Sequence, residues 1–173
     1  METEQIGLFE EKDIASACAL TGHRALSSDF SDEKLEEILK DLIDRRGVNT
    51  FYCGMAVGFD SAACEMLLSL RDEGRHVRIV ACVPCPEQAA RFSPVQKARY
   101  ERLLASCDEK VIVSPRYDGQ CMQKRNRYMV DRAAYLVAYC NKDKGGAANT
   151  VRYAQKKGRT VIFPFVAPER GES

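Results

Sequence analysis

Four short segments of the sequence combine glycine or proline with polar side chains in a way that could bind a phosphorylated ligand. Glycine lets the backbone approach a ligand with no Cβ in between, and free N–H groups at a helix start favour an anion. Arginine adds a planar guanidinium that can hold phosphate through two hydrogen bonds. The candidate ligand-binding residues in these segments are Thr21, Gly22, His23 and Arg24, then Gly54, Met55, Gly58 and Asp60, then Pro84 and Gln88, and finally Gly145, Gly146 and Thr150.

The glycines of two segments admit two interpretations. Gly54 and Gly58 could bring the backbone against a ligand, and Gly145 with Gly146 could do the same before the last helix. Alternatively, these glycines only make the tight turns that lead from a strand into a helix. Short glycine motifs often occur by chance, so neither loop alone separates the two interpretations. Four such segments on one edge of a parallel sheet make a stronger indication.

Asp60 and Arg24 suggest which segment would contact which part of a nucleotide. A carboxylate in the first helical turn is stabilised by the helix dipole but repels phosphate, so we expect Asp60 to contact ribose hydroxyls or a base. Its alternative role is an ordinary cap of the helix start. Arg24 is the stronger phosphate candidate, whereas His23 is either a ligand contact or a residue with only local hydrogen bonds. No catalytic residue is assigned, and Asp60 is the one acid that the sequence places for catalysis.

The eight cysteines are expected to be reduced and to pack as small apolar residues. Cys82 and Cys85 have CxxC spacing, but no second pair and only two histidines exist to complete a zinc site. We therefore expect no metal, while the sequence leaves a redox role for this pair open. Cys18, Cys53, Cys82 and Cys140 all fall on expected strands.

Short apolar runs alternate with segments of helical periodicity along the chain. Ser31 is a candidate N-cap, Pro94 begins a later helix, and the last helix follows Gly146. This alternation predicts a Rossmann-like α/β fold, a three-layer αβα sandwich with a mainly parallel sheet of about six strands. A single domain spans 1–173 with its core at about 17–165, and the two ends lack an apolar pattern that would dock them. The expected strands are 18–20, 51–53, 79–83, 110–113, 136–139 and 160–163.

The charge and the hydropathy pattern exclude several classes of protein. The 26 basic and 25 acidic side chains give a formal charge of +1, which argues against a dedicated nucleic-acid binder. No apolar run approaches the roughly 20 residues that cross a bilayer. The acidic start of the chain also lacks the features of a signal peptide. We therefore expect a cytoplasmic protein without a membrane contact.

The order of these motifs resembles the YpsA-like branch of the SLOG superfamily. That superfamily also includes the DprA DNA-processing proteins and the LOG-type cytokinin-activating phosphoribohydrolases. The resemblance covers about 17–165, is most specific in the GxxxGxD loop, and implies a Rossmann-like fold with a pocket for NAD, ADP-ribose or a related nucleotide. It rests on 21–24, 54–60, Gln88, 96–100 and 125–127. The pocket residues that it implies by position are Gly22, Arg24, Gly54, Gly58, Asp60, Arg125, Asn126 and Gly146.

The last glycine loop departs from the hydrolase branch of that superfamily. The hydrolases have a Gly-Gly-x-Gly-Thr loop closely followed by a catalytic glutamate, whereas no carboxylate closely follows Thr150 here. Glycosidic cleavage needs a positioned carboxylate. The favoured function is therefore binding or sensing of a nucleotide-derived small molecule. Alternatives are N-glycosidic cleavage of a nucleotide and, least favoured, DNA handling of the DprA type. No cofactor is required, and the sequence leaves open whether copies of the chain associate.

Overall fold

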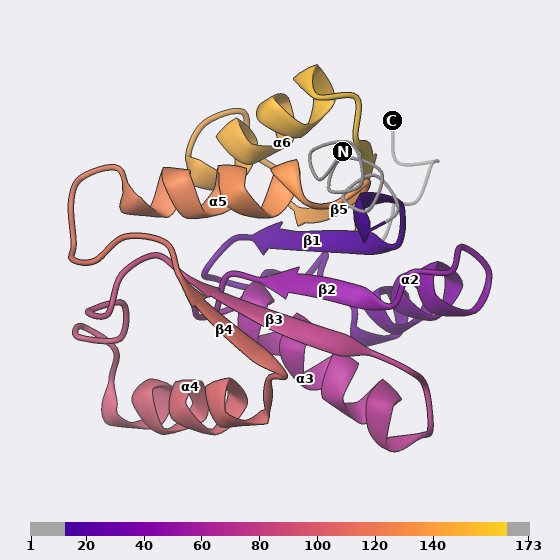
Figure 1. Cartoon of the computed structure of the whole chain (residues 1–173), viewed down its shortest axis with the longest axis horizontal. Helices are drawn as coiled ribbons and strands as arrows, with labels where there is room; N and C mark the ends of the chain where they lie inside the picture. The colour runs from indigo at the N-terminus through magenta and orange to yellow at the C-terminus, as the bar shows by residue number, and fades with distance from the viewer. Residues whose placement is uncertain (1–12, 166–173) are drawn as a thin grey trace, which may run out of the picture.

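The computed structural model describes residues 13–165, in which strands and helices alternate along the chain (Figure 1). The expected strands are present, with ends shifted by at most two residues, and helices connect them. Cys140 is predicted on a strand but lies just beyond the end of the fifth strand. The strands are β1 (Ala17–Gly22), β2 (Thr50–Cys53), β3 (Arg78–Val83), β4 (Glu109–Ile112), β5 (Tyr135–Tyr139) and β6 (Thr160–Ile162). The helices are α2 (Asp32–Asp44), α3 (Phe59–Asp72), α4 (Pro94–Ser106), α5 (Cys121–Asp131) and α6 (Gly146–Lys156).

The six strands form one parallel sheet in the order β4-β3-β2-β1-β5-β6. The chain builds outward from β1 through β2 and β3 to β4, then returns to the other side of β1 with β5 and β6. Ala19 in β1 consequently pairs with Tyr52 on one side and Leu136 on the other. The predicted Rossmann-like fold is confirmed, and its topological switch point lies between β1 and β5.

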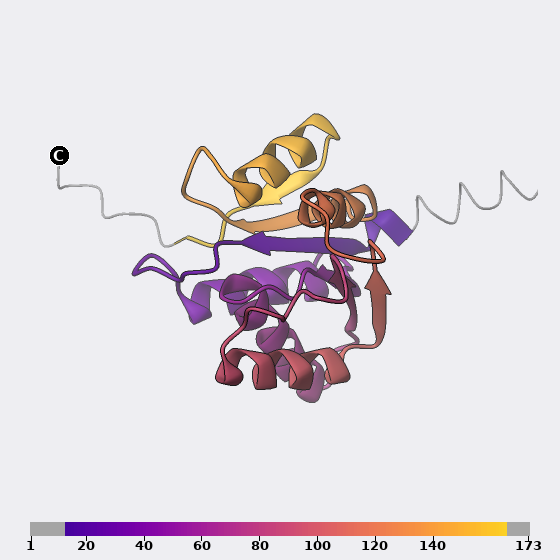
Figure 2. The same ribbon diagram turned by 90° about the vertical axis from the view of Figure 1, so that its left-hand side faces the viewer.

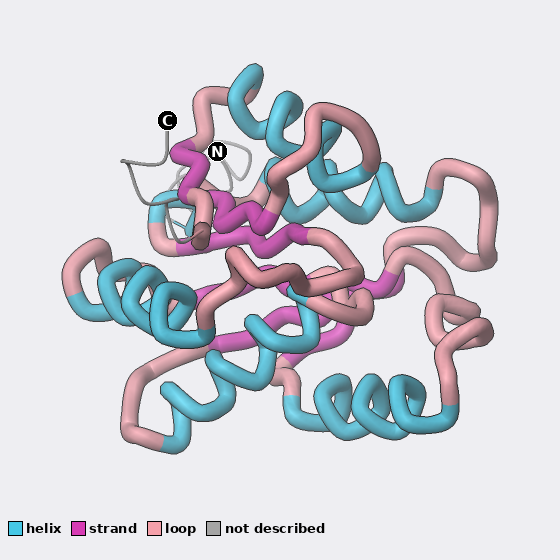
Figure 3. The backbone as a smooth tube through the Cα atoms, turned by 180° about the vertical axis from the view of Figure 1, so that it is seen from behind, coloured by secondary structure: helices cyan, strands magenta, loops and turns pink. Residues whose placement is uncertain are grey.

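Helices cover both faces of the sheet, as the edge-on view shows (Figure 2). Alternate residues of a strand point to opposite faces. Cys18 and Leu20 of β1 pack with the core residues of α2, α3 and α4, whereas Ala17 and Ala19 pack with those of α5 and α6. Seen from behind, the strands lie in the centre and the helices outside them (Figure 3). The central strands β1, β3 and β5 carry continuous apolar runs because helices cover both of their faces, whereas the edge strands β4 and β6 are exposed or half-buried.

Local capping sets the start of two helices. Ser31 precedes α2, and its hydroxyl accepts a hydrogen bond from the Lys34 backbone N–H at 3.2 Å. Ser93 and Gln96 form a reciprocal capping box before and within α4. Pro94 occupies the first helical turn, where its missing N–H has no partner to lose.

The prediction that the chain ends do not dock falls mainly outside the described residues. Residues 13–15 are described, and the Ile14 carbonyl accepts a hydrogen bond from the Ala134 N–H beside the start of β5. Between residues 13 and 165, no helix has both the length and the apolar content that crossing a bilayer requires.

Candidate functional site

The loops that follow β1, β2, β3 and β5 all leave the same edge of the sheet, because the strands are parallel. In Figure 1 the arrowheads of β1 and β2 point to the left, and the long loops after β3 and β4 project on that side. The structure thus brings the four predicted segments to the carboxyl edge, where open α/β sheets bind ligands.

A cleft of about 530 Å³ lies at this edge. Three predicted site residues line it: Arg24 from the loop after β1, Gln88 from the loop after β3, and Arg125 from α5. The remaining lining residues are Ala56, Val57, Cys85, Glu87, Ala90, Arg91, Phe92, Gln96, Tyr117 and Met122. None of these ten is predicted as a site residue from the sequence, although Ala56, Val57 and Gln96 lie within the motifs 54–60 and 96–100. Most of them lie in loops after strands, and that position is the signal that could have found Arg91 and Tyr117.

The carbonyl of Gly54 joins the loop after β2 to the loop after β3 and to α5. It accepts hydrogen bonds from Gln88 Nε2 at 2.9 Å and from Arg125 Nη1. The same Arg125 nitrogen lies 3.3 Å from the carbonyl of Cys82, at the end of β3. A Cβ on Gly54 would lie 2.8 Å from Arg125 Nη1 and 2.9 Å from Asp60 Oδ2. Gly54 therefore makes room for this buried pair of side chains.

Asp60 closes the loop between β2 and α3. It is buried, and its Oδ2 accepts a hydrogen bond from the Ala56 N–H at 3.1 Å, while Oδ1 has no partner among the described residues. Burial raises the pKa of Asp60 to about 6, against the opposing effects of Arg125, the Ala56 N–H and Arg24. Ala56 rather than Asp60 lines the cleft. The proposed contact of Asp60 with ribose hydroxyls stays a prediction.

Gly58 lets the loop after β1 pack against the start of α3. Its φ of 80° is unfavourable for other residues, and a Cβ there would lie 2.7 Å from Arg24 Cα and closer still to the Arg24 carbonyl. A Cβ on Gly22 would likewise lie 2.6 Å from the Phe59 side chain. The space in front of Gly58 is thus filled by protein backbone and is not open to a ligand.

The cleft carries an excess of positive charge. Arg24 is exposed, and its Nη2 lies 3.5 Å from the sulfur of Met122. Within the described part of the chain, neither Arg24 nor Arg91 forms an ion pair with a carboxylate. Glu87, the acid in the lining, accepts a hydrogen bond from the Tyr117 N–H at 3.1 Å. Two unpaired guanidinium groups therefore face this side of the molecule.

A polar network fills the switch point between β1 and β5. His23 Nε2 lies 3.1 Å from both the backbone nitrogen and Oδ1 of Asn141, so His23 has local hydrogen-bond partners. The buried Tyr139 hydroxyl donates to Asp29 Oδ1 at 2.6 Å. Hydrogen bonds from Ser27 and Tyr139, with a weaker one from Asn141, lower the pKa of Asp29 despite some desolvation.

The remaining predicted residues do not line the cleft. Thr21 is buried in β1, Pro84 is buried after β3, and Met55 packs into the core with a positive φ of 62°. The other four are placed as follows: Asn126 accepts a hydrogen bond from Arg125 Nε, Thr150 donates to the Gly146 carbonyl, and Gly145 and Gly146 have no atom near a would-be Cβ. A ligand role for these residues stays a prediction.

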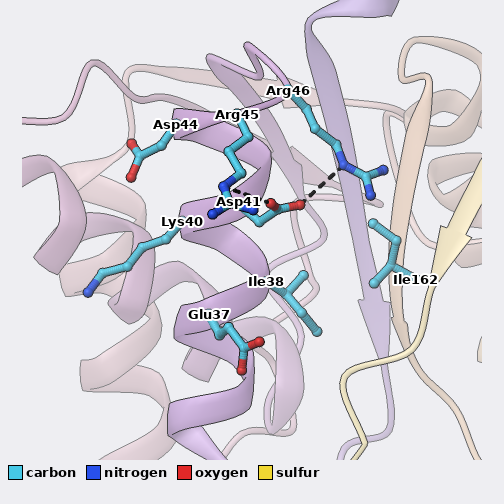
Figure 4. Close-up of a pocket in the computed structure, with 8 residues that line it drawn as sticks. All are labelled: Glu37, Ile38, Lys40, Asp41, Asp44, Arg45, Arg46 and Ile162. Atoms are coloured by element: carbon cyan, nitrogen blue, oxygen red, sulfur yellow. Dashed lines mark hydrogen bonds and ion pairs between the residues drawn. The ribbon is translucent and has the colours of Figure 1, made fainter.

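A second hollow of about 480 Å³ runs along α2 beside Ile162 of β6 (Figure 4). Its three acidic and three basic residues balance in charge, and Asp41 pairs with both Arg45 and Arg46. The two atoms that the structure leaves buried and unpaired among its described residues belong to Asp60 and Gln88, not to this hollow. The cleft at the carboxyl edge is therefore the better candidate site.

All eight cysteines are free thiols. Burial raises the pKa of Cys18 and Cys82 to about 12, so both stay protonated at neutral pH. Cys82 and Cys85 lie at the end of β3 and just after it. In the range 13–165, no three His, Cys, Asp or Glu side chains lie together as a metal site would require.

Solved structures resemble this fold. DNA processing protein A (DprA) from Streptococcus pneumoniae superposes with a TM-score of 0.64 over 90% of this chain, at 18% identity. The chain spans only 52% of that protein. DprA from Helicobacter pylori, studied for its single-stranded DNA binding mode, superposes with a TM-score of 0.63 at 16% identity. The match covers 92% of this chain and 68% of the DprA chain. At these identities the likeness shows the fold alone.

Sequence comparisons identify the family. The SPbeta prophage-derived protein YoqJ of Bacillus subtilis is 33% identical over 136 residues, or 72% of this chain and 80% of YoqJ. The UPF0398 protein BH1768 of Halalkalibacterium halodurans is 23% identical over 137 residues, or 78% and 71% of the two chains. The family model of YpsA, described as the YspA SLOG family, matches residues 22–163, and the chain belongs to this family.

Proposed function

We propose that this protein binds a nucleotide-derived small molecule in the cleft at the carboxyl edge of the sheet. The observation that carries the proposal is the set of three guanidinium groups, from Arg24, Arg91 and Arg125, on the wall of one cleft. Arg125 is committed to backbone carbonyls, which leaves Arg24 and Arg91 to bind an anion. Guanidinium groups hold phosphate through paired, charge-assisted hydrogen bonds.

The size and lining of the cleft suit a nucleotide. Its volume of about 530 Å³ is within the usual range of sites for small molecules and cofactors. Phe92, Tyr117 and Met122 add apolar surface beside the arginines, and Tyr117 is 65% exposed. Flat aromatic side chains can stack on a base while the cations hold its phosphates. NAD and ADP-ribose are the ligands that we favour within this class.

The geometry favours binding over N-glycosidic cleavage. The pKa of Asp60 is raised, as that of a general acid would be. However, Asp60 is buried and does not line the cleft. Glu87 lines the cleft, yet one of its oxygens already accepts the Tyr117 N–H. Asp60 therefore does not face a ligand in this cleft, and Glu87 is already held by the Tyr117 backbone.

A thermal-shift series followed by calorimetry tests the proposal. Wild type is screened with ADP, ADP-ribose and NAD, because a ligand that binds only the folded state raises the melting temperature. Arg24→Gln and Arg91→Gln should each weaken the binding of a phosphorylated ligand about 10-fold to 100-fold, the usual scale for a lost charge-assisted hydrogen bond.

Arg45→Gln is the matched control, since that side chain, directly after α2, is 84% exposed and does not line the cleft. Equal losses in all three variants would mean that net charge, and not the cleft, attracts the ligand. Absence of any shift by nucleotides at millimolar concentration would refute the proposal. Tight binding of single-stranded DNA at physiological salt would favour the DprA-like alternative.

A further inference from the structure

The side-chain amide of Gln88 is fixed in one orientation. Gln88 lines the cleft with only 9% exposure, and its Nε2 donates to the Gly54 carbonyl at 2.9 Å. A reversed amide would place its oxygen against the Gly54 oxygen, and neither of these atoms can donate a hydrogen bond. The hydrogen-bond network therefore determines which end of the amide is nitrogen.

This orientation leaves Gln88 Oε1 buried without a donor among the described residues. Arg125 shares the Gly54 carbonyl with Gln88, but no nitrogen of its guanidinium donates a hydrogen bond to Oε1, and its Nη1 donates to Gly54 and Cys82. Its Nε donates to the Asn126 side chain instead. A buried acceptor without a partner disfavours the state that contains it, so a state that supplies a donor is stabilised.

We infer that Gln88 Oε1 accepts a hydrogen bond from the bound ligand and thereby selects a phosphorylated compound that carries a hydroxyl or amino group. The inference rests on the proposed function: Arg24 and Arg91 bind the anion, and Gln88 recognises an uncharged donor. A keto oxygen or an unprotonated ring nitrogen cannot satisfy an amide oxygen, so ligands that differ by one such group are distinguished. Because Oε1 is enclosed in the free protein, the 84–93 loop shifts when the ligand binds.

The experiment compares four diphosphates by calorimetry on wild type and Gln88→Met. ADP carries both kinds of donor, 2′-deoxy-ADP and 3′-deoxy-ADP each lack one hydroxyl, and IDP has an oxygen in place of the amino group. Wild type should bind one of the three analogues about threefold to tenfold more weakly than ADP, the scale of one neutral hydrogen bond. Gln88→Met should bind ADP more weakly by a similar factor and should no longer distinguish that analogue from ADP.

The exposed Gln155→Met on α6 is the control and should bind as wild type does. Equal affinity of wild type for all four compounds would overturn the inference, and this arm needs no variant to fold. An equal loss for every compound in Gln88→Met would also overturn it, because the methionine would then act through shape alone. If wild type binds none of the four, this inference fails, and the proposed function fails with it only if ADP-ribose and NAD do not bind either.

Discussion

Gly58 lies directly against the backbone of Arg24, so that a Cβ on the glycine would approach the Arg24 carbonyl more closely than packing allows. This contact joins the loops after β1 and β2, and it places the Arg24 guanidinium at the mouth of the cleft. Because the two residues are far apart in the sequence, the contact forms only when the sheet edge is folded. The cost of filling this contact can be measured against Gly74, which also has a positive φ but has no atom within 4 Å of a would-be Cβ.

Gly58→Ala should destabilise the protein more than Gly74→Ala does. Both glycines have positive φ, 80° and 105°, so both substitutions strain the backbone by about 1–2 kcal/mol. Only Gly58 adds a clash with fixed backbone, which should lower the free energy of unfolding by about 2 kcal/mol more. Urea denaturation of the two variants measures the difference. Equal losses of unfolding free energy in the two variants would show that the loop after β1 moves away from the new Cβ at no cost.

Asp60→Asn should change how stability depends on pH. The folded-state pKa of about 6 exceeds the ordinary value of 3.8, so the folded protein holds this proton more tightly than the unfolded chain. Wild-type stability from this group is therefore greatest below about pH 4 and falls as pH rises through 6, by at most about 3 kcal/mol. Asparagine does not titrate, so the free energy of unfolding of the variant should rise relative to that of wild type between pH 4.5 and 7.5. A constant difference across that range would contradict the raised pKa.

Arg125→Met should destabilise the protein by about 3–5 kcal/mol, because it removes the buried cation that opposes Asp60 and two carbonyl contacts. Adding Asp60→Asn should recover part of this loss, since the unpaired carboxylate is then absent. The control is Arg127→Met on the same helix, whose exposed guanidinium lies 5.1 Å from the centre of the Tyr153 ring and contributes about 1 kcal/mol or less. Additive effects of the Arg125 and Asp60 substitutions would show that the pair is not coupled.

Cys107 should react with iodoacetamide faster than Cys18 and Cys82 in the native protein. A hydrogen bond from Cys64 lowers the pKa of the half-buried Cys107, whereas burial raises the pKa of Cys18 and Cys82 to about 12. The thiolate is the reactive form, so rate follows its population and access. Brief labelling at neutral pH, read by mass spectrometry, measures the order, and full labelling in denaturant calibrates it. Rapid labelling of Cys18 would indicate an opening of the central sheet.

The sequence predicts the sheet, and the edge at which its glycine-containing loops gather, because both depend on local patterns. Apolar runs that end in glycine or proline locate the strands, and parallel connection places Arg24, Gln88 and Arg125 on one edge. Arg91 and Tyr117 carry no periodic pattern, and only the path of their loops brings them to the cleft. Likewise, no spacing rule shows that a basic residue of α5 is buried against carbonyls rather than solvated.

The pairing of β1 with β5 has a consequence for synthesis on the ribosome. Ala19 pairs with Leu136, and about two thirds of the chain lies between them. The apolar middle strand thus keeps one unpaired edge until β5 has emerged, and long-range parallel pairing of this kind closes slowly. During that interval β1 exposes unpaired backbone N–H and C=O groups, to which a molecular chaperone or a second nascent chain would bind.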